Sequence, residues 1–337
     1  MSEAAFRASL QARLRARAAG SSWSQQELTR AFALQQFSAR LFRSEAGQRW
    51  VLTGGTALQY RTAEARPTAD ADLAARSESG DLLAELQAAT QPAPGEPGEF
   101  RLTITAGRTP GIHTGSLLYL LDGRRFANAS IDITVDRPMS LPPDLLTPEP
   151  VVAVDGLPEL PSMRVYPVAL HLADKIAAMY EHHGPDGTTP STRPHDLADI
   201  IILSRSTSVD AAVLRAAVTE QEQRRGITVP VPLTIPNPDW ERTYRERVRH
   251  TALPPDLHDL AAALAEANRF LAPALSGAAG GAWDPTTGGW APSAPSIGNL
   301  IQATRAERKP QTPSIRTEQP EAPPPDLTAE RDHGYDL

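Results

Sequence analysis

The chain has 337 residues, of which 40% are hydrophobic and 22% are charged, with a formal net charge of -7 and no cysteine. This length is enough for two domains with cores of their own, and the composition is ordinary for a globular protein. The negative net charge argues against a protein that coats nucleic acid over its whole surface, although it is compatible with a local basic groove. The absence of cysteine excludes disulfides, thiolate metal sites and cysteine catalysis.

The amino-terminal segment MSEAAFRASLQARLRARAAG is amphipathic and rich in arginine, and it lacks the apolar stretch of a secretory signal. No run in the sequence reaches the roughly 20 apolar residues that a membrane-spanning helix needs. We therefore expect a cytoplasmic protein with no membrane partner.

Both helices and strands are predicted in the first 136 residues. The spacing of apolar residues predicts helices over 3–19, 24–44, 56–63 and 79–90, and strands at 50–52, 69–75, 100–106, 115–121 and 128–136. Ser24 and Glu27 have the spacing of a capping box, and Ser79 and Asp81 are candidate caps of the fourth helix. In the last strand apolar and polar residues alternate, and Asp132 stands on the polar side.

A proline-rich segment, 137–150, marks a boundary, and the pattern after it becomes helical from Tyr166 onward. The helices expected there cover 166–181, 194–205, 208–223, 238–250 and 255–274. From Ser276 onward Gly, Pro, Ala and Ser dominate. Trp283 and Trp290 can still dock on the body, but the segment beyond about Leu300 cannot bury enough apolar surface to offset its ordering entropy. The expected parts are N-terminal helices (1–45), a sheet domain (46–150), a helical domain that completes the cleft (151–275) and a largely disordered tail (276–337).

Asp70 and Asp72 stand one residue apart on the second predicted strand. Residues i and i+2 of a strand project from the same face, about 7 Å apart at their Cα atoms, so both carboxylates could ligate one divalent cation. Two like charges in this arrangement raise each other's pKa unless a cation neutralises them, and carboxylate oxygens suit Mg²⁺ or Mn²⁺. Taken alone, however, such a pair is more often a solvated strand end than a metal site.

Two further features lie near this pair in the predicted sheet. The turn TGGT (53–56) opens a helix and offers backbone N–H groups that no Cβ obstructs, which makes it a suitable cradle for a triphosphate, although most such turns are only turns. A neighbouring strand could bring Asp132 beside Asp70 and Asp72 to form a cluster of three carboxylates. The alternative for Asp132 is an exposed position on a solvated strand.

Lys175 lies in the segment YPVALHLADKIAAMY, where a helical wheel places it on the border of the inward apolar stripe. A lysine in such a position needs an anion or a route to water. In the next helix Asp196 faces inward in line with Ile200, and Asp199 lies on the flank. Lys175 and Asp196 could therefore form an ion pair that lines a nucleotide cleft, or one that merely fixes the two helices.

The motifs that are present resemble those of a known family, whereas G-x-S-x-G, P-loop and G-x-G-x-x-G motifs are absent from the sequence. In chain order VLTGGTAL, RPTADADL, IDITVD, YPVALHLADKIAAM and RPHDLADI, followed by PDWERTYRE and FLAPAL, resemble the AbiEii/AbiGii-type nucleotidyltransferase toxins. These toxins are a branch of the DNA polymerase β-like nucleotidyltransferases. The resemblance covers about residues 28–290 and implies an α+β fold, in which a polymerase β-like domain with a mixed sheet precedes an all-helical C-terminal domain and a disordered tail.

The resemblance implies a phosphate-binding turn. Gly54, Gly55 and Thr56 stand where the glycine motif of the family cradles the nucleotide phosphates, and Gly55 replaces the serine of the wider superfamily. Thr68 occupies a position that can be phosphorylated in some members. A phosphate there would place about two negative charges beside the metal pair and should shut the site down.

The resemblance also implies metal-dependent transfer of a nucleoside monophosphate from an NTP. Asp70 and Asp72 match the metal pair of the family, which would hold Mg²⁺ or Mn²⁺ between the α-phosphate and the attacking oxygen. Asp132 would join them as a third carboxylate and activate the attacking hydroxyl. Lys175 would neutralise the β- and γ-phosphates, and Asp196, in RPHDLADI, matches the aspartate of the R-x-K-D-type motif of the family.

In characterised relatives the acceptor is often the 3′ end of tRNA, and the family implies a cognate antitoxin as partner. An acidic protein needs a local basic surface to bind RNA. The candidate surfaces are two arginine-rich helix faces, which hold Arg13, Arg15 and Arg17, and Arg242, Arg245, Arg247 and Arg249. Two departures from the family pattern are His195, where lysine is frequent, and the proline-rich tail. Two alternatives stay open: the same fold could modify a small molecule, as antibiotic nucleotidyltransferases do, or a degenerate relative could serve as a binding module.

Overall fold

A mixed seven-stranded sheet is the largest element of the computed structural model, which describes residues 2–75, 81–184, 186–249 and 251–292. The strand order is β3-β4-β5-β2-β1-β7-β6. β2 runs parallel to β5 and β1 parallel to β7, whereas the other neighbours are antiparallel. The strands are β1 (Trp50–Leu52), β2 (Asp70–Ala75), β3 (Glu99–Ala106), β4 (Ile112–Leu121), β5 (Arg124–Val135), β6 (Asp144–Leu146) and β7 (Met163–Val165).

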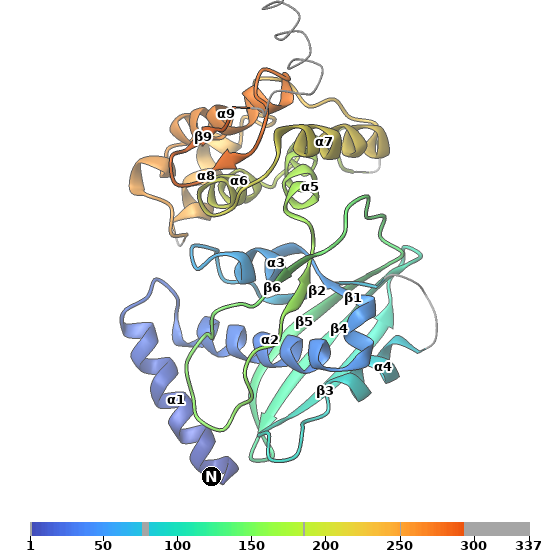
Figure 1. Ribbon diagram of the computed structural model, residues 1–337, viewed down its shortest axis with the longest axis vertical. Helices are drawn as coiled ribbons and strands as arrows, with labels where there is room; N and C mark the ends of the chain where they lie inside the picture. Colours follow the sequence, from blue (N-terminus) through green and yellow to red (C-terminus); the bar gives the residue numbers. More distant parts are fainter. Residues whose placement is uncertain (1, 76–80, 185, 250, 293–337) are drawn as a thin grey trace, which may run out of the picture. The chain divides into compact units, whose positions relative to one another are not determined.

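Helices from the first third of the chain accompany the sheet, and Figure 1 shows α2 crossing one of its faces. α1 buries Phe6, Leu10 and Leu14, which recur every four residues along one side of the helix. α2 begins with the predicted capping box, in which Ser24 and Glu27 each bond the backbone of the other. These helices are α1 (Glu3–Ala19), α2 (Gln25–Arg43), α3 (Gly54–Arg61) and α4 (Leu82–Ala89), with the 3-10 turn η1 (Glu45–Arg49) after α2.

The second half of the described chain is helical, as expected. Its elements are α5 (Val168–Tyr180), α6 (His195–Ser206), α7 (Ala211–Arg225), α8 (Trp240–Val248), the 3-10 turn η2 (Pro255–His258) and α9 (Leu260–Leu275). They surround a hydrophobic core whose largest buried side chains include Trp240, Trp283, Tyr166, Tyr244 and Phe270. Because α5 begins only three residues after β7 ends, the helical part is tied directly to the sheet, at the strand between β1 and the edge strand β6.

β1 and β2 stand between two hydrophobic cores, which explains the unbroken apolar run at β1. Alternate residues of a strand face opposite sides. On β2, Leu73 packs with α1, α2 and the neighbouring strands, whereas Ala74 packs with the helices that follow β7. Asp70 and Asp72 share the face of Ala74. The alternation of β2 therefore turns both carboxylates toward the helical half of the chain.

Trp283 and Trp290 dock on the helices, as expected from their sequence context. They lie in a hairpin of β8 (Trp283–Asp284) and β9 (Gly289–Trp290). Trp283 is 2% exposed, and the ring of Trp290 stacks on Phe270 with 5.6 Å between the ring centroids. Order thus extends beyond Ser276, where we expected the disordered tail to begin. The rest of that tail, 293–337, lies outside the described residues.

The sequence does not predict the short strands β6 and β7. Each has three residues and lies in or near proline-rich sequence, so neither offers a measurable alternation. β7 nevertheless pairs with both β1 and β6 and belongs to the sheet. Asp81 caps α4 as expected, whereas Ser79 lies outside the described residues. Among the helices that the structure describes, none is long and apolar enough to cross a membrane.

Candidate active site

The register of β2 and β5 brings the predicted carboxylates together on one face of the sheet. Asp70 pairs with Ser130, and Asp72 pairs with Asp132 across the parallel ladder. Ser130 Oγ donates a hydrogen bond of 2.6 Å to Asp70 Oδ1. Within the described residues, no lysine or arginine forms an ion pair with any of the three carboxylates. The negative charge of this face is left for a ligand or for solvent to balance.

The glycine turn before α3 is built around Asp72. The N–H of Gly55 donates to Asp72 Oδ2 at 2.9 Å, and the N–H of Thr53 donates to the carbonyl of Asp72 at 2.9 Å. Thr56 Oγ1 donates to the carbonyl of Asp70 at 2.8 Å, and the Thr56 side chain is completely buried. These bonds fix the carboxylate pair against the turn. The Gly55 N–H, which we expected to bind a phosphate, is therefore already engaged in a hydrogen bond to Asp72.

Thr68 lies behind the turn. It is 6% exposed, and a Cβ placed on Gly55 would come within 2.5 Å of Thr68 Oγ1. The same hydroxyl is 3.5 Å from the backbone N of Asp70. A kinase could reach it only if the turn moved, and its phosphorylation stays a prediction.

Burial and like charges disfavour the ionised form of Asp72. Burial, with the neighbouring charges of Asp70 and Asp132, raises the pKa of Asp72 to about 6, against the lowering effect of the hydrogen bond from Gly55. Burial and the charge of Asp70 also raise the pKa of Asp132. A carboxylate that is costly to ionise in this way is stabilised by a bound cation.

A buried ion cluster joins α5 to α6. Lys175 Nζ lies 3.2 Å from Asp196 Oδ1 and 2.5 Å from Asp199 Oδ2, and both carboxylates are completely buried. Arg193 Nε lies 2.7 Å from Asp196, and Arg66 Nε lies 3.4 Å from Asp199. The ion pair between Lys175 and Asp196 is therefore present. Asp199, which we expected on the flank, is a second and closer partner of Lys175.

The cluster keeps its members charged. Burial alone would raise the pKa of Asp196, but Lys175 and Arg193 hold this pKa well below its usual range. Burial alone would lower the pKa of Lys175, but Asp199 and Asp196 together raise it. The cluster contains three cations, Lys175, Arg66 and Arg193, and two carboxylates, those of Asp196 and Asp199. It therefore carries one positive charge in excess.

A second group of cations surrounds Asp174 on α5. Its carboxylate forms ion pairs with Arg137, with Arg224 at 3.2 Å and with Arg225 at 3.1 Å. Arg225 also lies 2.6 Å from Glu181. Three guanidinium groups thus face two carboxylates, and this part of the structure is positive as well.

A pocket of about 320 Å³ separates the carboxylates of the sheet from these cations. From the turn and the sheet it is lined by Thr53, Gly54, Asp72, Asp132 and Thr134. From the later segments it is lined by Arg137, Tyr166, His171, Asp174, Lys175, Ala178, Glu181, His183, Arg193, Asp196 and Arg225. The other residues of the predicted site, Gly55, Thr56, Thr68 and Asp70, are not among the residues that line this pocket. Groups suited to cations and groups suited to anions therefore face each other across one pocket.

The donor set suits a hard divalent cation that shares its ligands with a substrate. In the described residues no group of three or more His, Asp or Glu side chains is placed to hold a metal ion by itself. Mg²⁺ at nucleotide sites is usually held by one or two carboxylates together with phosphate oxygens and water. Asp72 and its neighbour Asp132 fit this requirement, because their charge is uncompensated and both pKa values are raised.

Several residues of the pocket and of the ion cluster are not predicted as site residues from the sequence. Asp199 follows Asp196 by one helical turn, so the wheel that placed Asp196 inward could have found it. Arg137, Arg193 and Arg225 had no such signal, because arginines on loops and helix ends are usually solvated. Only the fold shows that they converge on one pocket.

The chain is similar to a known protein family and to solved structures. Residues 36–267 match the sequence model of the family described as nucleotidyl transferase AbiEii toxin, type IV TA system. A search of curated proteins finds no match. Among solved structures, MenT4, a nucleotidyltransferase toxin from Mycobacterium tuberculosis, is 18% identical, with a TM-score of 0.53 over 79% of this chain and 89% of MenT4. A protein of H. pylori assigned as a nucleotidyltransferase is 15% identical, with a TM-score of 0.45 over 76% of this chain and 99% of its own.

MenT4 supports the nucleotidyltransferase fold, in which a mixed sheet is combined with helices as in this structure. The family match spans the glycine turn, the carboxylate strands and the helices that carry Lys175 and Asp196. The chain belongs to the AbiEii family of nucleotidyltransferase toxins of type IV toxin–antitoxin systems.

Proposed function

We propose that this nucleotidyltransferase moves a nucleoside monophosphate from an NTP to the 3′ end of an RNA, with tRNA as the acceptor and Mg²⁺ or Mn²⁺ as cofactor, in the cytoplasm. The observation that carries the proposal is the pocket whose carboxylate wall faces a wall with excess positive charge. A triphosphate with a divalent cation has the complementary distribution of charge. A cognate antitoxin is the partner that membership of a toxin–antitoxin family implies.

The reaction forms a bond between the acceptor hydroxyl oxygen and the α-phosphorus, and it breaks the bond from the α-phosphorus to the bridging oxygen of pyrophosphate. Asp72 and Asp132, with Asp70 next to them on the same face, would hold a divalent cation together with phosphate oxygens, and the cation would supply charge neutralisation for the transferred phosphate. Asp132 is the exposed member of the three, and its raised pKa favours its acceptance of the hydroxyl proton.

The opposite wall binds the leaving group in this proposal. Arg137, Arg193 and Arg225 line the pocket and are partly exposed, so they can reach the β- and γ-phosphates directly. Lys175 lines the pocket too, but its ammonium already has two buried carboxylate partners. Its contribution is the positive charge that the cluster has in excess, with Asp196 holding it in position.

The proposal is tested by incubating the full-length protein with each α-labelled NTP, Mg²⁺ and one of three acceptors. These are total tRNA, tRNA whose 3′ terminal ribose has been oxidised by periodate, and a panel of aminoglycosides. The expected result is label on intact tRNA, no label on oxidised tRNA, and no label when EDTA replaces Mg²⁺. Label found only on an aminoglycoside would overturn the RNA acceptor, and label on no acceptor would favour a binding module.

Replacing Gly54 by alanine is expected to disable the site. Gly54 has a φ of +52°, and a Cβ there would come within 2.3 Å of Asp72 Oδ2, so the carboxylate must move. We expect a loss of about 10²-fold in the transfer rate and of about 1–2 kcal/mol in the free energy of unfolding. The measurements are single-turnover transfer and urea denaturation.

The matched control for this variant is Gly123→Ala. Gly123 also has a positive φ, of +64°, but a Cβ there would meet no atom within 4 Å. This control should lose a similar amount of stability and keep its transfer rate. Equal rates in the two variants would show that the turn does not position Asp72 for the reaction.

A further inference from the structure

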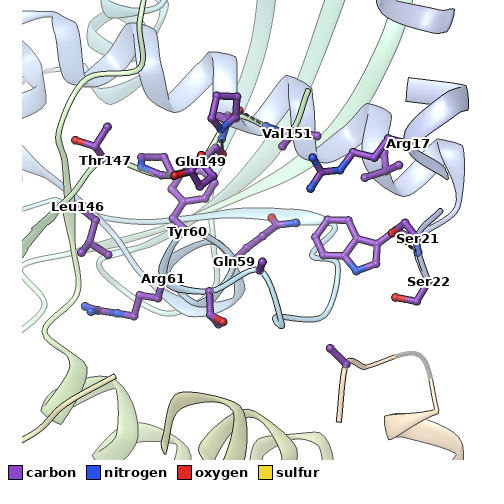
Figure 2. A pocket seen from close by; sticks show the side chains of 18 residues that line it. Arg17, Ser21, Ser22, Gln59, Tyr60, Arg61, Leu146, Thr147, Glu149 and Val151 are labelled. Carbon is purple, nitrogen blue, oxygen red and sulfur yellow. Dashed lines mark hydrogen bonds between the residues drawn. The ribbon is translucent and has the colours of Figure 1, made fainter. Parts of the chain in front are cut away.

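A second pocket, of about 330 Å³, lies at the carboxyl end of α3 (Figure 2). Its walls come from the junction of α1 and α2, from the last turn of α3 and from the segment 146–151. It shares no lining residue with the pocket of the carboxylates. α3 nevertheless reaches both, because it begins at Gly54 and ends at Arg61. Eight helical residues span about 12 Å, a distance that a few linked nucleotides can bridge.

The wall formed by the segment 146–151 is preorganised. The side chain of Gln35 donates to the carbonyl of Glu149 at 2.8 Å and accepts from the N–H of Val151 at 2.9 Å. Pro148 and Pro150 restrict the backbone on both sides of Glu149. A ligand that enters this pocket therefore meets a wall that is already fixed.

Gln59 differs from the polar residues around it. Its amide atoms Oε1 and Nε2 are both buried, and neither has a hydrogen-bond partner in the described part of the chain. By contrast, Tyr60 donates to Ser38 Oγ at 3.1 Å, and Arg61 donates to the carboxylate of Asp144 at 2.5 Å. A buried amide without partners destabilises a fold, and a ligand would satisfy this one after a rotation of the Gln59 side chain into the pocket.

The groups around Gln59 define the chemistry of that ligand. An amide offers one donor and one acceptor side by side, which matches the edge of a nucleobase. Trp23, a half-buried lining residue, offers an aromatic face for stacking, and Leu28 offers an apolar floor. Arg17 lines the same pocket and is exposed, so it can hold a phosphate next to the base.

The arginines of α1 divide into two kinds in the structure. Arg13 bonds the carbonyl of Ala153 at 3.0 Å and pairs with Asp155, so it serves the fold. Arg15 and Arg17 are exposed, and no hydrogen bond or ion pair to the side chain of either is found within the described residues. Of these two side chains, that of Arg17 lines the second pocket.

We propose that the second pocket receives one unstacked nucleobase of the RNA acceptor, whose edge bonds Gln59 while it stacks on Trp23 and its phosphate contacts Arg17. The inference rests on the RNA acceptor of the proposed function and places a second contact of that acceptor one helix length from the carboxylates. The same chemistry would suit the base of a free nucleotide, so the experiment includes both ligands.

The test measures binding rather than transfer, with the full-length protein, no NTP and EDTA present. The probe is a short single-stranded RNA of mixed sequence with a fluorescent label at its 5′ end, and fluorescence anisotropy gives its Kd. Gln59→Leu should raise this Kd by about tenfold. The same variant should raise the thermal midpoint by about 2–4 °C, because it removes a buried amide that has no partner. Gln91→Leu, which changes an exposed amide at the end of α4, should alter neither quantity.

A second pair of variants tests the stacking. Trp23→Leu should weaken RNA binding about tenfold, and Trp23→Phe should retain most of it, because phenylalanine keeps an aromatic face. In parallel, the four nucleoside monophosphates are titrated into the wild type and Gln59→Leu. The expected result is no saturable binding of the monophosphates at concentrations at which the RNA is fully bound.

Two outcomes would overturn the proposal. If Gln59→Leu leaves the RNA affinity unchanged and raises the thermal midpoint, Gln59 only destabilises the fold and does not contact the RNA. Binding of a monophosphate that depends on Gln59, with RNA affinity unchanged, would assign the pocket to a free nucleotide. If RNA binding depends on Gln59 but the wild type labels no RNA, the proposed transfer reaction fails and this binding site stands.

Discussion

Replacing Asp72 by asparagine is expected to lower the rate of nucleotidyl transfer by about 10³-fold or more while the protein stays folded. Asp72 lines the pocket beside Asp132, and its backbone and side chain are both held by the glycine turn. An asparagine can still accept the hydrogen bond from Gly55, but it cannot neutralise a divalent cation. The rate is measured in single-turnover conditions at saturating NTP and Mg²⁺.

Glu99→Gln is the matched control for this variant. Glu99 is an exposed carboxylate at the edge strand β3 of the same sheet, and it pairs only with Arg101, at 2.9 Å, among the described residues. The control removes one negative charge from the sheet without touching the pocket, so its rate should equal that of the wild type. An Asp72→Asn variant that kept a tenth of the wild-type rate would contradict the role of Asp72 as a metal ligand.

The same variant should be more stable than the wild type when no divalent cation is present. The pKa of Asp72 is about 6 in the folded state against 3.8 unperturbed, so the folded state binds this proton more tightly than the unfolded state does. The wild type therefore loses free energy of unfolding as the pH rises from about 4 through 6. Above that range the free energy of unfolding of Asp72→Asn should exceed that of the wild type by about 1–3 kcal/mol. This difference should vanish at about pH 4. Urea denaturation in EDTA measures the difference, and added Mg²⁺ should reduce it.

The carboxylate half of the site could be predicted because it depends on short-range patterns. The i, i+2 spacing of Asp70 and Asp72 places both on one face of a strand whatever the rest of the fold does. The glycine turn next to them follows from Gly54, which takes a positive φ that other residues rarely adopt. The proximity of Asp132 was an expectation only, because several registers of the two strands would satisfy the alternation of β5. The parallel ladder of β2 and β5 selects the register in which Asp132 stands beside Asp72.

The cationic half could be predicted only in part, because it depends on contacts between distant segments. The inward position of Lys175 follows from the period of α5, and that of Asp196 from the period of α6. The convergence of Arg137 and Arg225 on Asp174 does not follow from any local pattern, since the two arginines lie on either side of α5 in the sequence and are far from it. Nor does the sequence indicate that the Gly55 N–H is taken by Asp72.

Replacing Lys175 by methionine is expected to destabilise the fold by about 3 kcal/mol, the lower end of the cost of breaking a buried ion pair. Methionine fills a similar volume but leaves the completely buried Asp199 without its closest partner. The loss is at the lower end because Arg66 and Arg193 still neutralise part of the charge. Urea denaturation measures it. A loss below about 1 kcal/mol would mean that the cluster is more hydrated than its burial indicates.

A double variant separates the structural role of Lys175 from its role in the reaction. In Lys175→Met with Asp199→Asn, the carboxylate that lost its partner is neutral, and Asp196 still pairs with Arg193, so most of the lost stability should return. The transfer rate should not return, because the ammonium whose charge faces the phosphates is still missing. Recovery of both the stability and the transfer rate would show that the cluster has a structural role only. The sequence has 33 lysines and arginines, of which only Lys175 and Lys309 are lysines, so the cation closest to the buried Asp199 is a compact ammonium and not a guanidinium.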